Sequence, residues 1–276
     1  MDNAKLNFII PVRHYDSVNN WNSVKSNISR TLQSIAGQSY NNWHCYIVCN
    51  KGTDLPAIDD NFTVVTENFP YVTLPIKKDN PELYHDMIRM DKGMRVYAGF
   101  KKCKSSDFFM VVDYDDFVHQ DLSLFVCNST NVPDDIGLPQ GWLISHGYLY
   151  SGGSFALRNK RFDEVCGTSN IVKVSFIESF YDQSGSLSDK HIKELLGSHR
   201  FIKYYMNERA MRYESLPFYG AVYNVGISNS ASQTASVLDS LLSLRNTLRA
   251  PRGALNRWLS LSYFSRVKRK KFTINL

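Results

Sequence analysis

The length and composition describe a globular chain of one domain, alone or with an appendage. It has 276 residues, of which 43% are hydrophobic and 21% charged, which excludes a disordered, collagen-like or disulfide-stapled chain. No apolar run approaches the roughly 18 residues that a membrane-spanning helix needs, and the N-terminal residues lack the charge pattern of a signal peptide. We therefore expect a cytoplasmic protein whose five scattered cysteines are reduced and buried as small hydrophobic residues.

The charge is unevenly distributed along the chain. The formal net charge is +6, from 32 Lys and Arg against 26 Asp and Glu, but no acidic residue follows Asp239, whereas nine bases do. Leucines and Trp258 alternate with these bases. This pattern predicts a domain over 1–238 and a basic amphipathic extension over 239–276, which is expected to bind a polyanion.

An anionic membrane surface is the favoured partner of this extension, with its leucines and tryptophan facing the lipid. Nucleic acid is disfavoured because the rest of the chain is mildly acidic and its aromatic residues do not alternate with bases. The alternative is a solvated helix that packs its leucines on the body, interrupted at Pro251 and Gly253.

The first 120 residues alternate between apolar runs and amphipathic segments. Short apolar runs predict strands, and apolar residues at helical spacing predict helices, the first of which ends near Gly37. The predicted strands are 6–12, 44–49, 62–66 and 107–112, and the predicted helices are 24–36 and 87–100. This alternation predicts an α/β fold with a mainly parallel central sheet flanked by helices.

The pattern changes beyond residue 140. Strands are predicted over 142–150 and 154–157, meeting at the Gly152-Gly153 turn. A helix is predicted to begin at Asp189 behind the N-cap residue Ser188, and 216–225 is expected to be extended.

An acidic run directly follows the predicted strand 107–112. Asp113, Asp115 and Asp116 stand within four residues, and their carboxylates would repel one another without a cation. In open α/β sheets ligands bind at the carboxyl ends of strands, and Mg²⁺ or Mn²⁺ prefers oxygen ligands shared with substrate phosphates. The run therefore predicts a divalent metal that bridges a diphosphate, the alternative being an ordinary acidic turn.

The order of several motifs resembles the GT-A-fold nucleotide-sugar glycosyltransferases of the family-2 type. These motifs are an apolar strand that ends in Pro-Val-Arg, a helix followed by Gln-Ser-Tyr-Asn-Asn-Trp, and an Asp-Lys-Gly segment ahead of Asp-Tyr-Asp-Asp. They occupy 8–13, 38–43, 91–93 and 113–116. The resemblance covers residues 6–120 well, is looser to about 218 and is absent after about 236.

The resemblance implies a role for each matching residue. Pro11 and Arg13 would close the first strand beside the nucleotide, and Asp91 and Lys92 would line the same pocket. Asp113 would face the ribose or diphosphate and Asp115 would bind the metal. Asp116 would either hold these ligands from behind or serve as an alternate metal ligand. Where the family often has an acidic residue on the base or ribose, this chain has Cys49 or Asn50. Asn50 can still hydrogen-bond a uracil edge.

Two residues of the second half are candidates for catalysis. An inverting transferase needs a base for the acceptor hydroxyl, and the family usually supplies an Asp near a helix start, which matches Asp189. His199 matches the position of a late metal-ligating His in some GT-A enzymes. The alternatives are an Asp that only favours the helix N-terminus and a structural His. The Gly167-Thr168-Ser169 segment is either a turn that holds acceptor or diphosphate or an ordinary turn.

These observations together predict a metal-dependent glycosyltransferase. It would move a sugar from a nucleotide-diphospho-sugar, with a UDP-sugar favoured, to a glycan or lipid-linked acceptor in surface polysaccharide or lipopolysaccharide synthesis. It would work in the cytoplasm or on the inner face of the plasma membrane. The alternatives are a catalytically silent domain of this type and a nucleotidyltransferase, although the segment after the first strand lacks the glycines of a phosphate-binding loop.

Overall fold

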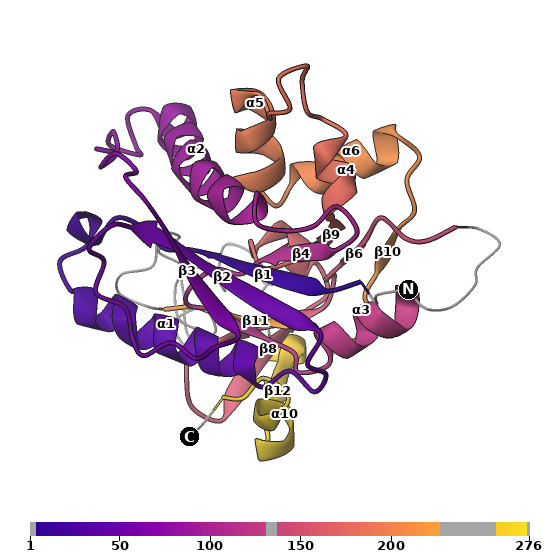
Figure 1. Ribbon diagram of the computed structural model, residues 1–276. Helices are drawn as coiled ribbons and strands as arrows, with labels where there is room; N and C mark the ends of the chain where they lie inside the picture. Colours follow the sequence, from indigo (N-terminus) through magenta and orange to yellow (C-terminus); the bar gives the residue numbers. More distant parts are fainter. Residues whose placement is uncertain (1–3, 131–136, 227–257, 275–276) are drawn as a thin grey trace.

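The fold has two sheets, and helices lie on both faces of the larger one (Figure 1). A computed structural model of the chain describes residues 4–130, 137–226 and 258–274. The larger sheet has the strand order β10-β6-β9-β4-β1-β2-β3, and the smaller sheet has the order β12-β8-β7-β11-β5. The predicted fold class, a mainly parallel central sheet flanked by helices, is confirmed.

The larger sheet is built around the first strand of the chain. Its β1 pairs in parallel with β2 and with β4, and β2 pairs in parallel with β3. Beyond β4 lies the antiparallel β9, followed by β6 and β10. The strands are β1 Leu6–Pro11, β2 Trp43–Asn50, β3 Phe62–Glu67, β4 Phe108–Val111, β6 Gly141–Leu143, β9 Asn170–Lys173 and β10 Tyr213–Ser215.

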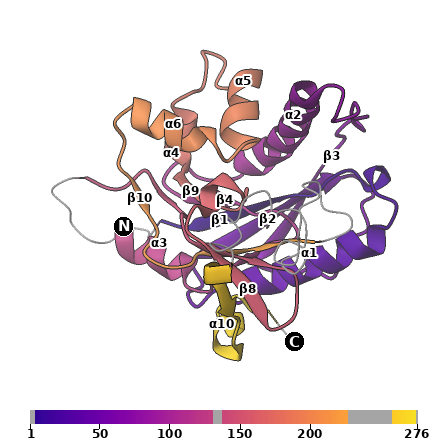
Figure 2. The same cartoon turned by 180° about the vertical axis from the view of Figure 1, so that it is seen from behind.

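Helices cover both faces of this sheet. Alternate residues of β1 enter two separate cores: Phe8 and Ile10 pack with α1 and α3, while Ile9 packs with α2, α4 and α6. Figure 2 shows the same two layers from behind. The helices are α1 Trp21–Ala36, α2 Pro81–Phe100, α3 Leu122–Thr130, α4 Val174–Glu178, α5 Asp189–His191 and α6 Phe201–Glu208, with a π-helical turn η3 at Ile192–Leu196.

The predicted elements are found with some changes in their bounds. The helix predicted over 87–100 begins at Pro81 because the Asn80 side chain accepts a hydrogen bond from the backbone N–H of Leu83. The strand predicted over 142–150 is two strands in different sheets, β6 and β7 Gly147–Tyr150. A Cβ on Gly147 would lie 2.2 Å from the Phe162 ring, so the chain passes this ring closely where it changes sheets.

The smaller sheet contains the predicted turn at Gly152 and Gly153. The strands on either side of it, β7 and β8, pair antiparallel, and β11 joins β7 to the two-residue β5 just after the acidic run. Of the segment predicted to be extended over 216–225, only β11 is a strand. The members not yet named are β5 Phe117–Val118, β8 Phe155–Asn159, β11 Ala221–Asn224 and β12 Leu261–Tyr263.

The described part of the expected basic extension packs against the body. Strand β12 pairs antiparallel with β8, and the short helix α10 Arg266–Lys270 follows it. Phe264 and Phe272 are buried with Tyr148 in the core of the smaller sheet. Residues 239–257, with four of the nine bases, lie outside the described residues. Among the residues that the structure describes, no helix is long and apolar enough to cross a membrane.

Candidate functional site

The acidic run lies at the carboxyl end of β4, beside the end of β1. Backbone hydrogen bonds from Val12 to Val48 and from Val112 to Ile9 extend the pairing of these strands to the edge of the sheet. Helix α1 fixes the backbone of the run, because the Thr31 hydroxyl donates to the backbone carbonyls of Tyr114 and Asp116 at 2.8 and 2.9 Å. The acidic side chains are therefore fixed where ligands of open α/β sheets bind.

Asp113 carries the most accessible carboxylate of the run. Its side chain is 32% exposed, and Oδ1 accepts a hydrogen bond from the Lys92 ammonium at 2.5 Å. Burial favours the neutral amine of Lys92, but the Asp113 carboxylate outweighs it and the pKa of Lys92 is raised. Helix α2 thus places one positive charge directly beside the acidic run.

The other two carboxylates are buried, in different surroundings. Burial and the charge of Asp113 raise the pKa of Asp115 to about 7. Burial, followed by the charge of Asp115, raises the pKa of Asp116 well above its ordinary value. Asp116 is fully buried, and both of its oxygens accept hydrogen bonds: from Thr168 Oγ1 at 2.6 Å and Cys166 Sγ at 3.2 Å, and from the Asn224 backbone N–H at 3.3 Å. Asp116 therefore joins the run to the 166–169 loop and to β11.

The 166–169 segment is a loop pressed against the acidic run. The Thr168 hydroxyl also accepts a hydrogen bond from the Asp113 backbone N–H at 3.0 Å. A Cβ on Gly167 would lie 2.6 Å from Asp113 Oδ2 and 2.8 Å from Lys92 Nζ, so a larger residue here would displace these two side chains. The sequence drew attention to Gly167 and Thr168 as a turn, and the structure brings that turn into the site.

Asn50 and Asp91 are engaged in a network around a buried guanidinium. Arg95 is 1% exposed; its Nη1 donates to the Val12 carbonyl and to Asn50 Oδ1, both at 2.8 Å. Its Nε and Nη2 donate to the Asp91 carboxylate at 2.9 to 3.1 Å, and the Asn50 amide donates to the Phe69 carbonyl at 2.6 Å. Sequence reasoning missed Arg95, whose only signal was its spacing of four residues from Asp91 on one helix.

This network leaves the predicted base-reading role of Asn50 without support. The Asn50 side chain is buried, and each end of its amide is hydrogen-bonded within the protein. Pro11 is the buried last residue of β1, and the Arg13 guanidinium donates to Ser17 Oγ at 2.7 Å and to the Ser17 carbonyl at 3.1 Å.

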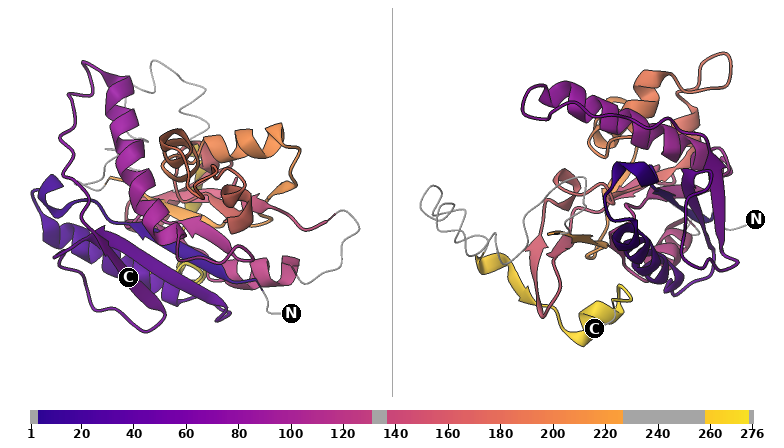
Figure 3. Two further views of the ribbon diagram at one scale, coloured as in Figure 1. Left: turned by 45° about the horizontal axis from the view of Figure 1, so that its top comes forward. Right: turned by 90° about the vertical axis from the view of Figure 1, so that its left-hand side faces the viewer.

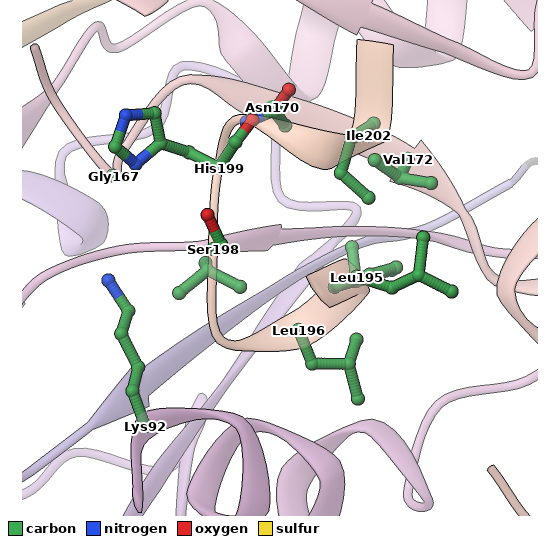
Figure 4. Close-up of a pocket in the computed structure, with 11 residues that line it drawn as sticks. Lys92, Gly167, Asn170, Val172, Leu195, Leu196, Ser198, His199 and Ile202 are labelled. Atoms are coloured by element: carbon green, nitrogen blue, oxygen red, sulfur yellow. The ribbon is translucent and has the colours of Figure 1, made fainter. Parts of the chain in front are cut away.

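A small hollow with a volume of about 20 Å³, room for about one water molecule, lies next to Lys92 and Gly167. His199, Ser198 and Asn170 supply its polar lining, and apolar side chains of β4, β9, η3 and α6 form the rest. In Figure 4 the Lys92 ammonium rises from α2 toward Ser198, and His199 lies beside Gly167. A small polar group entering this hollow would meet the ammonium, a hydroxyl and an imidazole.

His199 and Asp189 are placed differently by the structure. Burial, and then the charge of Lys92, lowers the pKa of His199 to about 4, so its imidazole is neutral at pH 7. Its Nε2 is buried and has no hydrogen-bond partner among the described residues. Asp189 is exposed at the start of α5, which Ser188 caps through a hydrogen bond to the His191 backbone N–H.

The acidic run offers a divalent metal only a small set of donor atoms. Within the described ranges, no group of three or more His, Cys, Asp and Glu side chains is arranged to hold a metal ion. The donor set that the structure leaves is Asp113 and Asp115, since both oxygens of Asp116 are hydrogen-bonded within the protein. Two carboxylates still fit Mg²⁺ or Mn²⁺ when substrate phosphates and water complete the shell.

Comparisons with known proteins give weak likenesses. No protein-family model matches the sequence, and no curated protein matches it. Among solved structures the chain is similar to TarS from S. aureus, with 15% identity and a TM-score of 0.46; the match covers 99% of this chain and 46% of TarS, so the chain spans about half the length of that protein. It is also similar to 4-diphosphocytidyl-2C-methyl-D-erythritol synthase from Anaerococcus prevotii, with 11% identity, a TM-score of 0.41, and coverage of 83% of this chain and 93% of that one.

Both TM-scores are below 0.5, so neither likeness assigns an activity to this chain. The architecture follows from its own strands: β3-β2-β1-β4 run in parallel, the antiparallel β9 comes next, and the acidic run ends β4 beside β1. The protein has an α/β fold with a mainly parallel central sheet, and its acidic strand end faces Lys92 and the 166–169 loop.

Proposed function

We propose that the protein is a metal-dependent glycosyltransferase that uses a nucleotide-diphospho-sugar. The observation that carries this proposal is the pair Asp113 and Asp115 at the carboxyl end of β4, with the Lys92 ammonium against Asp113. Opposite charges side by side suit a diphosphate, because the ammonium can bind its oxygens while the carboxylates hold a cation. The donor class comes from the family resemblance, and the motif order over residues 6–120 supports it.

Asp113 and Asp115 would hold Mg²⁺ or Mn²⁺, and Asp116 is left out of this set because of its internal hydrogen bonds. When bound, the cation would act as a Lewis acid that stabilises charge on the departing diphosphate. Lys92 would neutralise part of the same charge from α2. Thr168 positions the acidic run, because its hydroxyl accepts a hydrogen bond from the Asp113 backbone N–H and donates one to the Asp116 carboxylate.

Of the two candidate bases, His199 has the better position in the structure. It lines the hollow beside Lys92, it is neutral at pH 7, and its buried Nε2 can accept a proton or ligate the cation. Asp189 is exposed at the start of α5. We therefore propose that His199 faces the acceptor side of the site, and that the acceptor is a glycan or lipid-linked sugar of a surface polysaccharide or lipopolysaccharide.

The test is thermal stability across a panel of nucleoside diphosphates with and without Mn²⁺. A ligand that binds only the native state raises Tm, so we expect one nucleotide, UDP in the favoured case, to raise Tm only with the metal. Asp115→Ala should abolish this shift while the protein alone stays folded. Asp60→Ala, an exposed carboxylate next to β3, is the matched control and should keep the shift.

The outcomes separate the proposal from its alternatives. No shift with any nucleotide would favour the catalytically silent domain, and an equal shift in Asp115→Ala would remove that residue from the metal set. Release of nucleoside diphosphate from a sugar donor would then measure turnover, which His199→Asn should lower. Unchanged donor affinity in this variant would assign His199 to the acceptor side, and a lower metal-dependent affinity would assign it to the cation.

A further inference from the structure

The end of the molecule formed by β12 and α10 exposes several large apolar side chains. We call it the C-terminal patch and define it by five residues with exposed fractions of 47 to 70%: Phe155, Trp258, Leu259, Tyr263 and Val267. Figure 3 shows β12 and α10 projecting together from the side of the body. Exposed aromatic and aliphatic side chains concentrated in one short segment and the strand that it pairs with favour an interaction surface over scattered surface residues.

The patch is held in place by the packing beneath it. Tyr263 stands opposite Phe155 in the β12–β8 pair, with ring centroids 5.9 Å apart. The Arg158 guanidinium donates to the Leu259 carbonyl at 3.0 Å. The buried Phe264 and Phe272 anchor residues 258–274 in the core of the smaller sheet. The backbone that carries the exposed groups is therefore fixed by packing.

Residues 258–274 and strand β8, which form the patch, carry charges of a single sign. Residues 258–274 contain five bases and no acid, and β8 contributes Arg158 and no acid. Two of the five bases are used internally: Lys268 Nζ donates to Ser262 Oγ at 2.8 Å, and Arg269 Nε donates to the Phe264 carbonyl at 2.9 Å. The other three, Arg266, Lys270 and Lys271, are exposed.

We propose that the C-terminal patch docks the protein on a bilayer that contains anionic lipid. Trp and Tyr side chains prefer the boundary between headgroups and acyl chains, and Lys and Arg keep their charges at the headgroups while their stems cover apolar surface. Anionic headgroups attract each nearby base, and apolar insertion adds a second, salt-insensitive contribution. A protein partner would need acidic groups spaced to match these bases. A bilayer needs only negatively charged headgroups and an apolar interior into which the exposed side chains can insert.

Co-sedimentation of the full chain with vesicles tests this proposal. The vesicles are phosphatidylcholine alone or phosphatidylcholine with about one quarter phosphatidylglycerol, at about 0.1 M and about 0.5 M salt. We expect binding about tenfold or more tighter to the anionic vesicles, weakened by salt. The variant Arg266→Gln, Lys270→Gln, Lys271→Gln should lose about tenfold or more of that affinity, and Leu259→Ser with Tyr263→Ser should lose binding at both salt concentrations.

The matched control removes three charges elsewhere. Lys101, Lys102 and Lys104 are exposed just after α2, and their replacement by Gln should leave vesicle binding within about threefold. Equal losses in both triple variants would overturn the proposal, since they would reveal only a net-charge effect. Failure of the unaltered chain to bind anionic vesicles would overturn it too, as would a dimer in sedimentation velocity that Tyr263→Ser dissociates, because the patch would then be a contact between two copies. Thermal unfolding confirms that each variant is folded.

Discussion

At the residue scale, carboxylates of the same acidic run play different parts: one is accessible to a ligand, and another holds the structure together. Asp113 is partly exposed beside Lys92, whereas Asp116 accepts hydrogen bonds from Thr168, Cys166 and the Asn224 backbone. The chain order Asp-Tyr-Asp-Asp does not distinguish them. The difference arises from the 166–169 loop and β11, which close over Asp116 from distant parts of the chain.

Asp116→Ala is therefore expected to reduce stability more than Asp115→Ala. The change leaves the Thr168 hydroxyl and the Asn224 N–H without their acceptor, and each buried unsatisfied group costs about 1–3 kcal/mol. We expect a loss of about 2 kcal/mol or more in the free energy of unfolding, measured in urea. For Asp115→Ala we expect little loss, since that change also relieves repulsion with Asp113. Equal stability of the two variants would contradict this assignment.

His119 gives a pH dependence of stability. Burial lowers its pKa to about 4, and its ring packs against Phe218 and Phe272 while Nδ1 accepts a hydrogen bond from the Asp121 N–H. The unfolded chain, with an ordinary pKa near 6.5, binds the proton first as pH falls, so the stability is complete above about pH 6.5 and is lost toward pH 4. The loss amounts to about 3 kcal/mol at pH 4.

The check is urea unfolding at several pH values for the protein and for His119→Asn. The asparagine oxygen can replace Nδ1 as an acceptor but does not titrate in this range. We expect a shallower fall in stability below pH 6.5 for the variant, whatever its stability at pH 7. Parallel curves would show that His119 does not carry the effect.

At the element scale, Arg95 joins α2 to the ends of two strands. Its guanidinium reaches the Val12 carbonyl after β1 and Asn50 at the end of β2, and its partner Asp91 lies one turn back on α2. The Phe69 ring lies under the guanidinium, 4.5 Å from its centroid. This contact sets where Lys92, the next residue after Asp91, stands relative to the acidic run.

Arg95→Lys is expected to lower the free energy of unfolding by about 3 kcal/mol. Lysine keeps the charge but lacks the planar guanidinium whose N–H groups donate to Asp91, Val12 and Asn50 at once. Breaking a buried ion pair costs roughly 3–5 kcal/mol. Chemical denaturation measures the change. Arg89→Lys, on the partly exposed Asp86 pair of the same helix, is the control and should change stability by less than about 1 kcal/mol. Similar small effects at both positions would show that Arg95 is not a structural link.

The elements also show how far the sequence alone predicts this molecule. Apolar runs of five to seven residues and helical spacing locate β1 to β4 and α1, because those signals are local. The division of 142–150 between two sheets depends on Phe162 packing beside Gly147, and the closure over Asp116 depends on Thr168 and Asn224. These contacts join residues far apart in the chain. The family resemblance therefore assigned Lys92 and Asp113 to the nucleotide site, but it did not indicate Arg95 as their support.

At the scale of the whole molecule, residues 258–274 are part of the folded body. Phe264 and Phe272 are buried, and β12 forms an edge of the smaller sheet. Deletion of residues 258–276 should therefore expose the core of that sheet and lower the free energy of unfolding by about 5 kcal/mol or more, given about 3–5 kcal/mol for each buried Phe side chain that is removed.

Differential scanning calorimetry would measure the lower Tm of the truncated chain. Phe264→Ala keeps the prediction testable if that chain is insoluble, with an expected loss of about 3 kcal/mol. Val267→Ser, at a side chain that is 70% exposed, is the control and should leave Tm unchanged. An unaltered Tm after deletion would mean that the segment contributes no packing energy.

The position of β12 also affects folding during synthesis. The larger sheet has all its strands once Ser215 has left the ribosome, but the smaller sheet lacks β12 until Tyr263 follows, about 50 residues later. At about 5–20 residues per second, that interval lasts several seconds. During it the edge of β8 and the aromatic face that Phe264 covers are open. We therefore expect a nascent chain stalled after Asn224 to bind chaperones, although its acidic strand end is already assembled.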